Sequence, residues 1–294
     1  MTKPHYDIAM IGHFAVDKIT AGGETVTASG GAVYYGAMAL AHLGYRVAVI
    51  TRMHPRDFPR LDELRAVGID VFVQEADETG GMENIYHTAD RDKRDCKPLG
   101  FAGAFAEAEL PDIDAAFYLI IPILAGEVDL PTLKAVASRG PVGLDVQGFV
   151  RCVDGDDVVF RDWPDKAEGL PHVRRLKVDD TEAEVLTGLT DRRAAATALA
   201  ALGPDEVLLT HKDGVLVLVE GAFHEARFCP TRVRGRTGRG DTCFSTYCAM
   251  RLRHDPETAI RYAAAVTSLK MEDPGPFARP EEDVARTLEA TQEA

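Results

Sequence analysis

The sequence predicts an α/β fold: a doubly wound, mainly parallel sheet that is flanked by helices and carries a small β lid. Short apolar runs typical of buried strands alternate with longer helical segments along most of the chain. Two stretches, approximately 13–28 and 74–102, break this rhythm with short alternating segments around polar turns. We therefore expect one domain over residues 1–294, into which these two stretches are inserted as lid segments.

The order of the expected elements favours a parallel sheet with helices on both faces, because each crossover between parallel strands carries a helix. Buried strands are expected at 6–12, 47–50, 69–73, 117–121, 142–145, 174–178 and 207–210. Helical segments are expected at 30–44, 58–67, 130–138, 182–186, 192–202, 241–253, 256–272 and 281–292, with a hairpin over 215–226.

Composition narrows the class of protein. The chain has 294 residues, of which 46% are apolar and 27% charged, and its net charge of −14 disfavours a nucleic-acid partner. The five cysteines are scattered without a C-x-x-C pair, which indicates reduced thiols in a cytoplasmic protein. The longest apolar run, 115–125, is interrupted by Pro122 and falls far short of the ~20 residues that a membrane span needs. We expect neither a membrane nor a nucleic acid as partner.

The glycine-rich stretch 235–244 carries the clearest functional signal in the sequence. Gly238 and Gly240 precede Asp241, which opens an amphipathic helical run. A helix N-terminus with bare glycine backbone favours an anion such as a phosphate. An acid at that point can take the proton of an attacking hydroxyl. The alternative is a glycine-rich turn in which Asp241 is an ordinary acid of the first helical turn.

Several ordered motifs support the first interpretation. They are a Gly-Gly pair opening the helix over 30–44, a strand-end segment at 145–151, a segment at 177–188 similar to an N-x-x-E motif, and 237–241, similar to T-G-A-G-D. In this order and over nearly the full length, the chain resembles the ribokinase-like carbohydrate kinases, the PfkB family. That resemblance implies the ribokinase-like version of the fold.

The resemblance also implies a kinase that transfers a phosphoryl group from ATP, with Mg²⁺, to a hydroxyl of a sugar, a polyol or a nucleoside. Asp241 would be the base, and the backbone of Gly238, Arg239 and Gly240 would form the anion hole. The other implied residues are Asp17, Gly30, Gly31 and Tyr35 for the substrate; Asp179, Thr210, Gly214 and Thr237 for the nucleotide and its Mg²⁺; and Glu182 for the metal.

The chemistry of the acids agrees with these roles, although each has a plainer alternative. Carboxylates suit Mg²⁺, and Asp17 can accept hydrogen bonds from two neighbouring hydroxyls. Asp17 could equally be a solvated turn acid, and Asp179 with Glu182 would also make a helix capping box. The glycines at 30 and 31 could face a substrate or merely relieve crowding.

Some positions depart from the family pattern. Asp179 stands where an Asn is usual, Tyr35 replaces a substrate-binding Asn, and Gly235 replaces an Asp, which weakens any monovalent-cation site. Arg239 replaces the alanine of the anion hole. We expect Arg239, together with Arg236, to reach the donor phosphates, because guanidinium groups suit phosphate oxygens. We expect Arg232 and Arg234 to lie on a solvated face.

The sequence thus predicts an ATP- and Mg²⁺-dependent kinase for a small sugar or polyol. The segment Gln147-Gly148-Phe149 resembles inositol-kinase-like members, so a cyclic polyol is preferred. A nucleoside is the alternative acceptor, and Phe14, Tyr34 or Tyr35 would then stack on the base. A non-catalytic ligand-binding module on the same fold is the other alternative. An exposed edge of the β lid suggests a homodimer.

Overall fold

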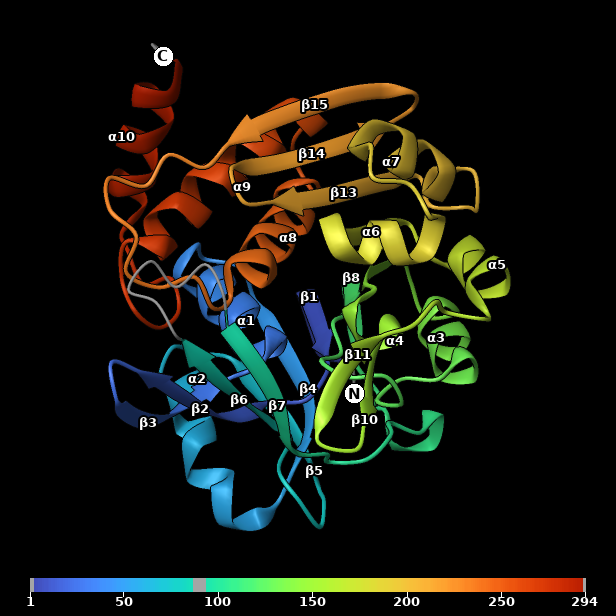
Figure 1. Ribbon diagram of the computed structural model, residues 1–294, viewed down its shortest axis with the longest axis vertical. Coiled ribbons are helices and arrows are strands. Elements are labelled where there is room, and N and C mark those ends of the chain that lie inside the picture. Colours follow the sequence, from blue (N-terminus) through green and yellow to red (C-terminus); the bar gives the residue numbers. More distant parts are fainter. Residues whose placement is uncertain (1–2, 87–93, 293–294) are drawn as a thin grey trace.

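A computed structural model describes residues 3–86 and 94–292 of the chain (Figure 1). Residues 87–93 of the expected lid segment lie outside the described residues. The two sets of strands that concern the site are a large central sheet and a smaller sheet beside it.

The central sheet has nine strands in the order β15-β14-β13-β12-β9-β8-β1-β4-β5. All neighbours from β5 to β13 are parallel, and β14 and β15 are antiparallel additions at one edge. The α/β class expected from the sequence is therefore confirmed. Its strands are β1 His5–Ile11, β4 Val47–Met53, β5 Asp70–Glu75, β8 Asp114–Ile120, β9 Val142–Asp145, β12 Arg175–Asp179, β13 Glu206–His211, β14 Gly214–Val219 and β15 Ala222–Arg227.

Helices cover both faces of this sheet because alternate strand residues point to opposite sides. In β1, Ile8 and Met10 pack with the helices α1, α8 and α9, whereas Ala9 and Ile11 pack with α3, α6 and α7. The helices are α1 Ala32–His42, α2 Asp62–Arg65, α3 Leu130–Ala137, α4 Gln147–Val150, α5 Lys166–Gly169, α6 Asp180–Thr187, α7 Arg192–Ala200, α8 Arg239–Met250, α9 Pro256–Met271 and α10 Glu281–Gln292.

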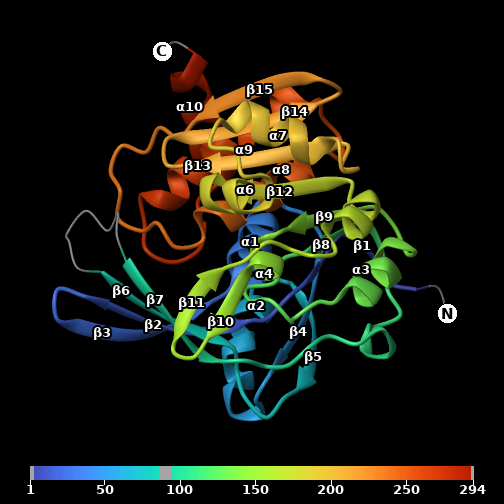
Figure 2. The ribbon, with the colours of Figure 1, turned by 45° about the vertical axis from the view of Figure 1, so that its right-hand side comes forward.

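The second sheet, which we call the lid sheet, has four strands in the order β3-β2-β6-β7. Its strands are β2 Ala15–Ala21, β3 Glu24–Gly30, β6 Gly81–Tyr86 and β7 Arg94–Gly100. The parallel pairing of β2 with β6 joins two segments that are far apart in the sequence. Figure 2 shows this sheet extending from the body of the molecule below α1.

One local expectation was wrong, and one hairpin was not expected. The helix expected over 58–67 is a 3₁₀ helix, Pro55–Leu61, followed by the single turn of α2. Pro59 lies inside the 3₁₀ segment, where it cannot donate a backbone hydrogen bond, so a regular helix cannot run through it. The hairpin of β10 Arg151–Asp154 and β11 Asp157–Phe160 was not expected, and it lies beside β7 of the lid sheet (Figures 1 and 2).

Two further observations bear on the expected class of protein. No helix in the described ranges is long and apolar enough to cross a membrane. All five cysteines are free thiols. That the chain behaves as the single domain expected over 1–294 stays a prediction.

Candidate active site

A polar cavity of about 180 Å³ lies between the lid sheet and the carboxyl ends of the central strands. It is lined by residues from the lid sheet, from α1, from the ends of β12 and β13, and from the start of α8. The lining residues are Asp17, Gly31, Ala32, Tyr35, Met82, Asn84, Ile123, Gln147, Arg151, Lys177, Asp179, Thr210, Arg236, Thr237, Gly238, Arg239, Gly240 and Asp241. Most residues that the sequence selected are thus brought together. Gly30, Gly214 and Glu182 do not line this cavity.

The stretch 235–241, which we call the anion loop, turns into α8 at Gly238. Gly238 has φ 80 and is the N-cap of α8, and no side chain caps this helix end. A Cβ on Gly238 would lie 2.2 Å from the ring of Tyr35, so no other residue fits. The positive end of the helix dipole and the backbone N–H groups of the first turn therefore face the cavity, where they favour an anion.

Asp241 lies in the first turn of α8 and faces the same cavity as the anion loop. A carboxylate in this position can accept a proton from a hydroxyl placed against a bound phosphate. Burial raises the pKa of Tyr35, and the negative charges of Asp17 and Asp241 add to this change. Asp241 and the anion loop are therefore adjacent parts of one helix end.

Asp17 belongs to β2 of the lid sheet and is 6% exposed. Its Oδ1 accepts a hydrogen bond from the backbone N–H of Met82 at 2.8 Å, which ties β2 to β6. A Cβ on Gly30 would lie 2.2 Å from Asp17 Oδ2, so Gly30 makes room for this carboxylate. Gly31 has φ 89 at the N-cap of α1. The glycine pair relieves crowding, and Gly31 also borders the cavity.

The lid sheet also contacts the anion loop directly. The hydroxyl of Tyr86, at the end of β6, and Thr237 Oγ1 form a hydrogen bond of 3.1 Å. Asp17, on the neighbouring strand, faces the cavity from the same sheet. The lid sheet therefore brings an acid to the cavity and closes against the loop that would hold a phosphate.

Asp179 and Glu182 form the capping box that was the plainer interpretation of their spacing. Glu182 N–H donates to Asp179 Oδ1 at 2.9 Å, and Asp179 N–H donates to Glu182 Oε2 at 2.7 Å. Glu182 is 1% exposed, whereas Asp179 borders the cavity. Within the described residues, no group of three or more His, Cys, Asp or Glu side chains could hold a metal ion.

Lys177 is a cavity residue to which sequence reasoning gave no role. Its Nζ lies 3.1 Å from Asp145 Oδ1 and 3.3 Å from Glu182 Oε2, and a Cβ on Gly240 would be only 3.6 Å from it. Burial lowers the pKa of Lys177, but the carboxylates of Asp145 and Glu182 outweigh this and raise it above its ordinary value. A permanent positive charge therefore lies beside the anion loop. Its only sequence signal was a lysine inside an apolar strand.

Three further polar residues of the cavity were not assigned from the sequence. They are Asn84 on β6, Gln147 at the start of α4 and Arg151 at the start of β10. Asn84 is 3% exposed, and its Oδ1 accepts a hydrogen bond from the thiol of Cys96 on β7 at 3.2 Å. The alternation of side chains along β6 could have predicted that Asn84 faces inward. No neighbouring residue in the sequence indicated which cavity it would face.

The arginines divide as the sequence suggested. Arg236 and Arg239 line the cavity, and Arg239 Nη1 also donates to the carbonyl of Lys212 at 3.4 Å. Arg232 and Arg234 are exposed, and Arg232 lies 4.0 Å from Asp273. Arg236 and Arg239 in the anion loop and Lys177 beside it thus concentrate positive charge at the cavity. Guanidinium and ammonium groups can bind phosphate oxygens there.

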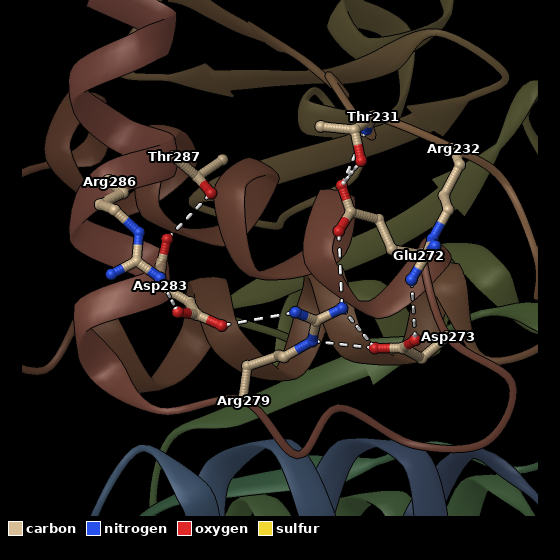
Figure 3. Close-up of polar contacts among 8 residues, drawn as sticks. All are labelled: Thr231, Arg232, Glu272, Asp273, Arg279, Asp283, Arg286 and Thr287. Atoms are coloured by element: carbon tan, nitrogen blue, oxygen red, sulfur yellow. Dashed lines mark hydrogen bonds and ion pairs between the residues drawn. The ribbon is translucent and has the colours of Figure 1, made fainter.

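A network at the C-terminal end of α9 fastens the chain that leads into the anion loop (Figure 3). Glu272 Oε1 accepts hydrogen bonds from both N–H and Oγ1 of Thr231 at 2.8 Å. Arg279 bridges Glu272 at 3.5 Å and Asp273 at 2.5 Å, and it also reaches Asp283 of α10. The segment before the loop is therefore held to α9 and α10 at once.

The three aromatic side chains that would stack on a nucleobase are almost fully buried. Phe14 is fully buried, and Tyr34 and Tyr35 are 6% and 4% exposed. The Tyr34 hydroxyl donates to Glu63 at 2.6 Å, and the Tyr35 ring supports Gly238. Phe14 and Tyr34 do not line the cavity; Tyr35 lines it, but its ring is packed against Gly238.

The comparisons with known proteins agree with this fold. The model of the pfkB family carbohydrate kinases matches residues 5–282, so the chain belongs to that family. Among solved structures, a pyrophosphate-dependent kinase in the ribokinase family, complexed with a pyrophosphate analog and myo-inositol, superposes with a TM-score of 0.88 at 33% identity, over 95% of this chain and 99% of that one.

Two other relatives extend the comparison. A structure describing the conversion of a pyrophosphate-dependent myo-inositol-1 kinase into a myo-inositol-3 kinase has a TM-score of 0.87 at 32% identity, over 98% of this chain and all of the other. A cytidine kinase from Thermococcus kodakarensis is 27% identical over 268 residues, which are 87% of this chain and 92% of the relative.

Proposed function

We propose that this kinase phosphorylates a hydroxyl of a small cyclic polyol of the inositol kind. The observation that carries the proposal is a single cavity in which Asp17, Asp241 and the anion loop meet. Asp17 would accept hydrogen bonds from neighbouring hydroxyls, and Asn84 and Gln147 would add amide donors and acceptors. The myo-inositol named for two of the structural relatives supports this acceptor class.

A nucleoside is the second acceptor class, and the cytidine kinase relative supports it. Phe14 and Tyr34 lie outside the cavity and the Tyr35 ring is packed against Gly238, which weighs against a nucleoside, because a base would be expected to stack on an aromatic ring. A non-catalytic binding module is disfavoured, since binding alone would need neither an acid at the helix end nor a cluster of cations beside it.

The reaction follows from the arrangement of charges. Asp241 accepts the proton of the acceptor hydroxyl as its oxygen attacks the transferred phosphorus, and the bond from that phosphorus to the leaving phosphate oxygen breaks. The backbone of residues 238–240 and the cations of Arg236, Arg239 and Lys177 offset the negative charge on the phosphate oxygens. The leaving phosphate carries away the electron pair of the broken bond.

For the donor, we favour pyrophosphate over the ATP expected from the sequence. The cavity is small and is lined by four cationic side chains. Gly214, expected to flank a nucleotide, lies in the hairpin of β13 and β14 outside it. Two structural relatives above 30% identity are named as pyrophosphate-dependent. Because pyrophosphate has no base to bind, a small cationic cavity is sufficient for it.

ATP is the second candidate donor, because a larger hollow adjoins the segment that leads into the anion loop. This hollow of about 560 Å³ is bordered by Cys229, Thr231, Ala264, Ala265 and Leu269, among others. Its size falls within the range of small-molecule pockets. An adenine ring would find apolar surface there.

Mg²⁺ fits the site when most of its ligands come from water and phosphate, as is usual for this ion. Asp179, which borders the cavity, would hold such an ion, and Glu182 would orient Asp179 through the capping box. Bound Mg²⁺ would neutralise charge on the donor phosphates. The absence of a dedicated metal cluster among the described residues agrees with an ion that arrives with the donor.

The test is phosphoryl transfer measured with each donor against a panel of inositols, sugars and nucleosides, with Mg²⁺ present and with it chelated. The proposal predicts turnover with pyrophosphate and an inositol, and little with nucleosides. Turnover only with ATP would show that ATP is the donor in place of pyrophosphate. Turnover only with nucleosides would contradict the proposed polyol acceptor.

A further inference from the structure

Lys270, in the last turn of α9, is a buried ammonium group that the proposed reaction does not yet use. It is 2% exposed, although a fully buried lysine is rare unless it is paired. The negative end of the α9 dipole favours a cation there. Its location next to the anion loop, with no carboxylate in hydrogen-bond contact among the described ion pairs, calls for an explanation.

The contacts of Lys270 all lead to the anion loop. Its Nζ donates to the carbonyl of Gly235 at 3.1 Å and lies 5.4 Å from the centre of the Tyr35 ring. The Cγ end of that ring occupies the space where Gly238 has no side chain. Lys270 therefore touches the first residue of the anion loop directly and its turning point through Tyr35.

The neighbouring backbone strengthens this connection. The N–H groups of Arg234 and Gly235 both donate to the carbonyl of Met271, at 2.8 and 3.1 Å. A Cβ on Gly235 would lie 2.8 Å from the carbonyl oxygen of Asp273 and 3.4 Å from Lys270 Nζ. The end of α9 thus forms the surface against which the start of the anion loop is built, and Gly235 permits the close approach.

The charged groups around Lys270 come from three elements. Asp241 and Arg239 face it from α8, Asp273 follows α9, and the Tyr35 ring covers it from α1. Burial lowers the pKa of Lys270 to about 8, while Asp241 and Asp273 oppose that change and Arg239 adds to it. The ammonium form therefore persists at neutral pH and is lost just above it.

We propose that Lys270 is a positioning residue for phosphoryl transfer: its ammonium group holds the anion loop through the Gly235 carbonyl and places a fixed positive charge behind Asp241 and the bound phosphate. This inference rests on the proposed function, because it assigns to Lys270 a part in that reaction. Lys270 does not line the cavity and does not touch the reacting atoms.

The first test compares Lys270→Met and Lys270→Arg with Lys134→Met, a control at a half-exposed lysine on α3 that pairs with Glu168. We expect Lys270→Met to lower kcat at least about tenfold, with a much smaller change in the polyol KM. Lys270→Arg should retain more activity, since it keeps the charge. The control should behave as the unchanged protein.

Stability separates this role from a structural one. Because the folded-state pKa of Lys270 is lowered, the unfolded chain holds this proton more tightly, and the charged form costs stability below about pH 8. Lys270→Met should therefore leave Tm at pH 7 unchanged or raise it while activity falls. A fall in Tm that parallels the fall in activity, in both the Met and the Arg variants, would overturn the proposal.

Two further measurements depend on the charge itself. In the unchanged protein kcat should fall above about pH 8, where Lys270 loses its proton. This alkaline fall in the pH profile should be absent in Lys270→Met. Ammonium or methylammonium should restore part of the activity of Lys270→Ala but none of that of Asp241→Asn. An alkaline limb that survives in Lys270→Met, or a lack of any rescue, would contradict the assignment.

Failure of the proposed function would be recognised separately. If the unchanged protein showed no turnover with any donor and acceptor, the function would be wrong, and calorimetric binding of inorganic pyrophosphate would still test Lys270. We expect the affinity of Lys270→Met to be at least about tenfold weaker, as for loss of a charge near a bound anion. Equal affinities would overturn the role of Lys270.

Discussion

Asp17 shows how a residue far from the anion loop in sequence can belong to the same reaction. Its carboxylate keeps one oxygen on the Met82 N–H and faces the cavity from the lid sheet. A hydroxyl that donates to a buried carboxylate makes a stronger hydrogen bond than one that donates to a neutral acceptor. Asp17 therefore fits the recognition of the polyol better than the solvated turn acid that the sequence also allowed.

We predict that Asp17→Asn raises the polyol KM about 10- to 100-fold, because a hydrogen bond to a charged group is lost while the amide oxygen can still accept from Met82. The KM of the phosphate donor should change little. Steady-state kinetics with each substrate varied in turn measures this. An equal rise in both KM values would assign Asp17 to the architecture of the site in place of acceptor binding.

Lys177 and Lys270 show why residue-level prediction from sequence is limited. The Gly238–Asp241 segment was recognisable because its signal is local: glycines, then an acid, at the start of a helix. Apart from Glu182, which is five residues from Lys177, the partners of the two lysines come from distant parts of the chain: the Asp145 carboxylate, the Gly235 carbonyl and the Tyr35 ring. No spacing within their own helix or strand could indicate those partners.

At the scale of elements, the N-terminus of α8 depends on the helix α1 that supports it. The Tyr35 ring fills the space beside Gly238, so the left-handed turn and the close approach are required together. The Tyr35 position, at which a substrate-binding residue was expected, therefore also shapes the loop. This contact between α1 and α8 therefore helps to fix where the anion would bind.

Gly44 provides a matched control for this contact, because it shares φ 80 with Gly238 but has nothing within 4 Å of a Cβ. We predict that Gly44→Ala costs about 1–2 kcal/mol, the usual penalty for a left-handed non-glycine residue. Gly238→Ala should cost about 1–3 kcal/mol more through overpacking against Tyr35, and it should abolish turnover. Denaturant unfolding and kcat measure both.

Equal destabilisation by the two alanine variants would mean that Tyr35 yields easily. Packing against α1 would then not fix the anion loop, and Lys270 could not position the loop through the Tyr35 ring. Full activity in Gly238→Ala would contradict the role of the bare backbone at this helix end.

Elements were predicted well where their signal was periodic. The apolar strands and the helices α1, α8, α9 and α10 were expected close to their observed positions, because alternation and helical spacing are local properties. The prediction of a helix at 58–67 was wrong because it followed the apolar spacing and did not take account of Pro59. The β10–β11 hairpin was missed because its strands are short and partly exposed, with little alternation to detect them.

At the scale of the whole molecule, the lid sheet has an open edge at β3. Four successive residues of β3, from Glu24 to Thr27, are exposed, and Val26 is 56% exposed. An unpaired strand edge with an apolar side chain is a template for pairing with another strand. The homodimer expected from the sequence therefore stays a proposal with a defined surface.

We predict that sedimentation of the purified protein gives a dimer, and that Val26→Lys shifts it toward the monomer, because a charge on an edge strand opposes pairing. Lys3→Gln, on the exposed N-terminal side of β1, serves as a control for a surface change away from the lid sheet. A monomer at all concentrations, or a dimer unaffected by Val26→Lys, would exclude the β3 edge as the interface.

The proposed function combines parts of the whole molecule: the lid sheet would present a polyol, and α8 would present Asp241 as the base beside a bound phosphate. The most direct test is kcat for phosphoryl transfer to myo-inositol in Asp241→Asn, measured together with myo-inositol binding by calorimetry. The account predicts that kcat falls about 10²- to 10⁴-fold, as for loss of a general base, while binding is nearly unchanged. Retained turnover in this variant would contradict the assignment of Asp241 and, with it, the proposed mechanism.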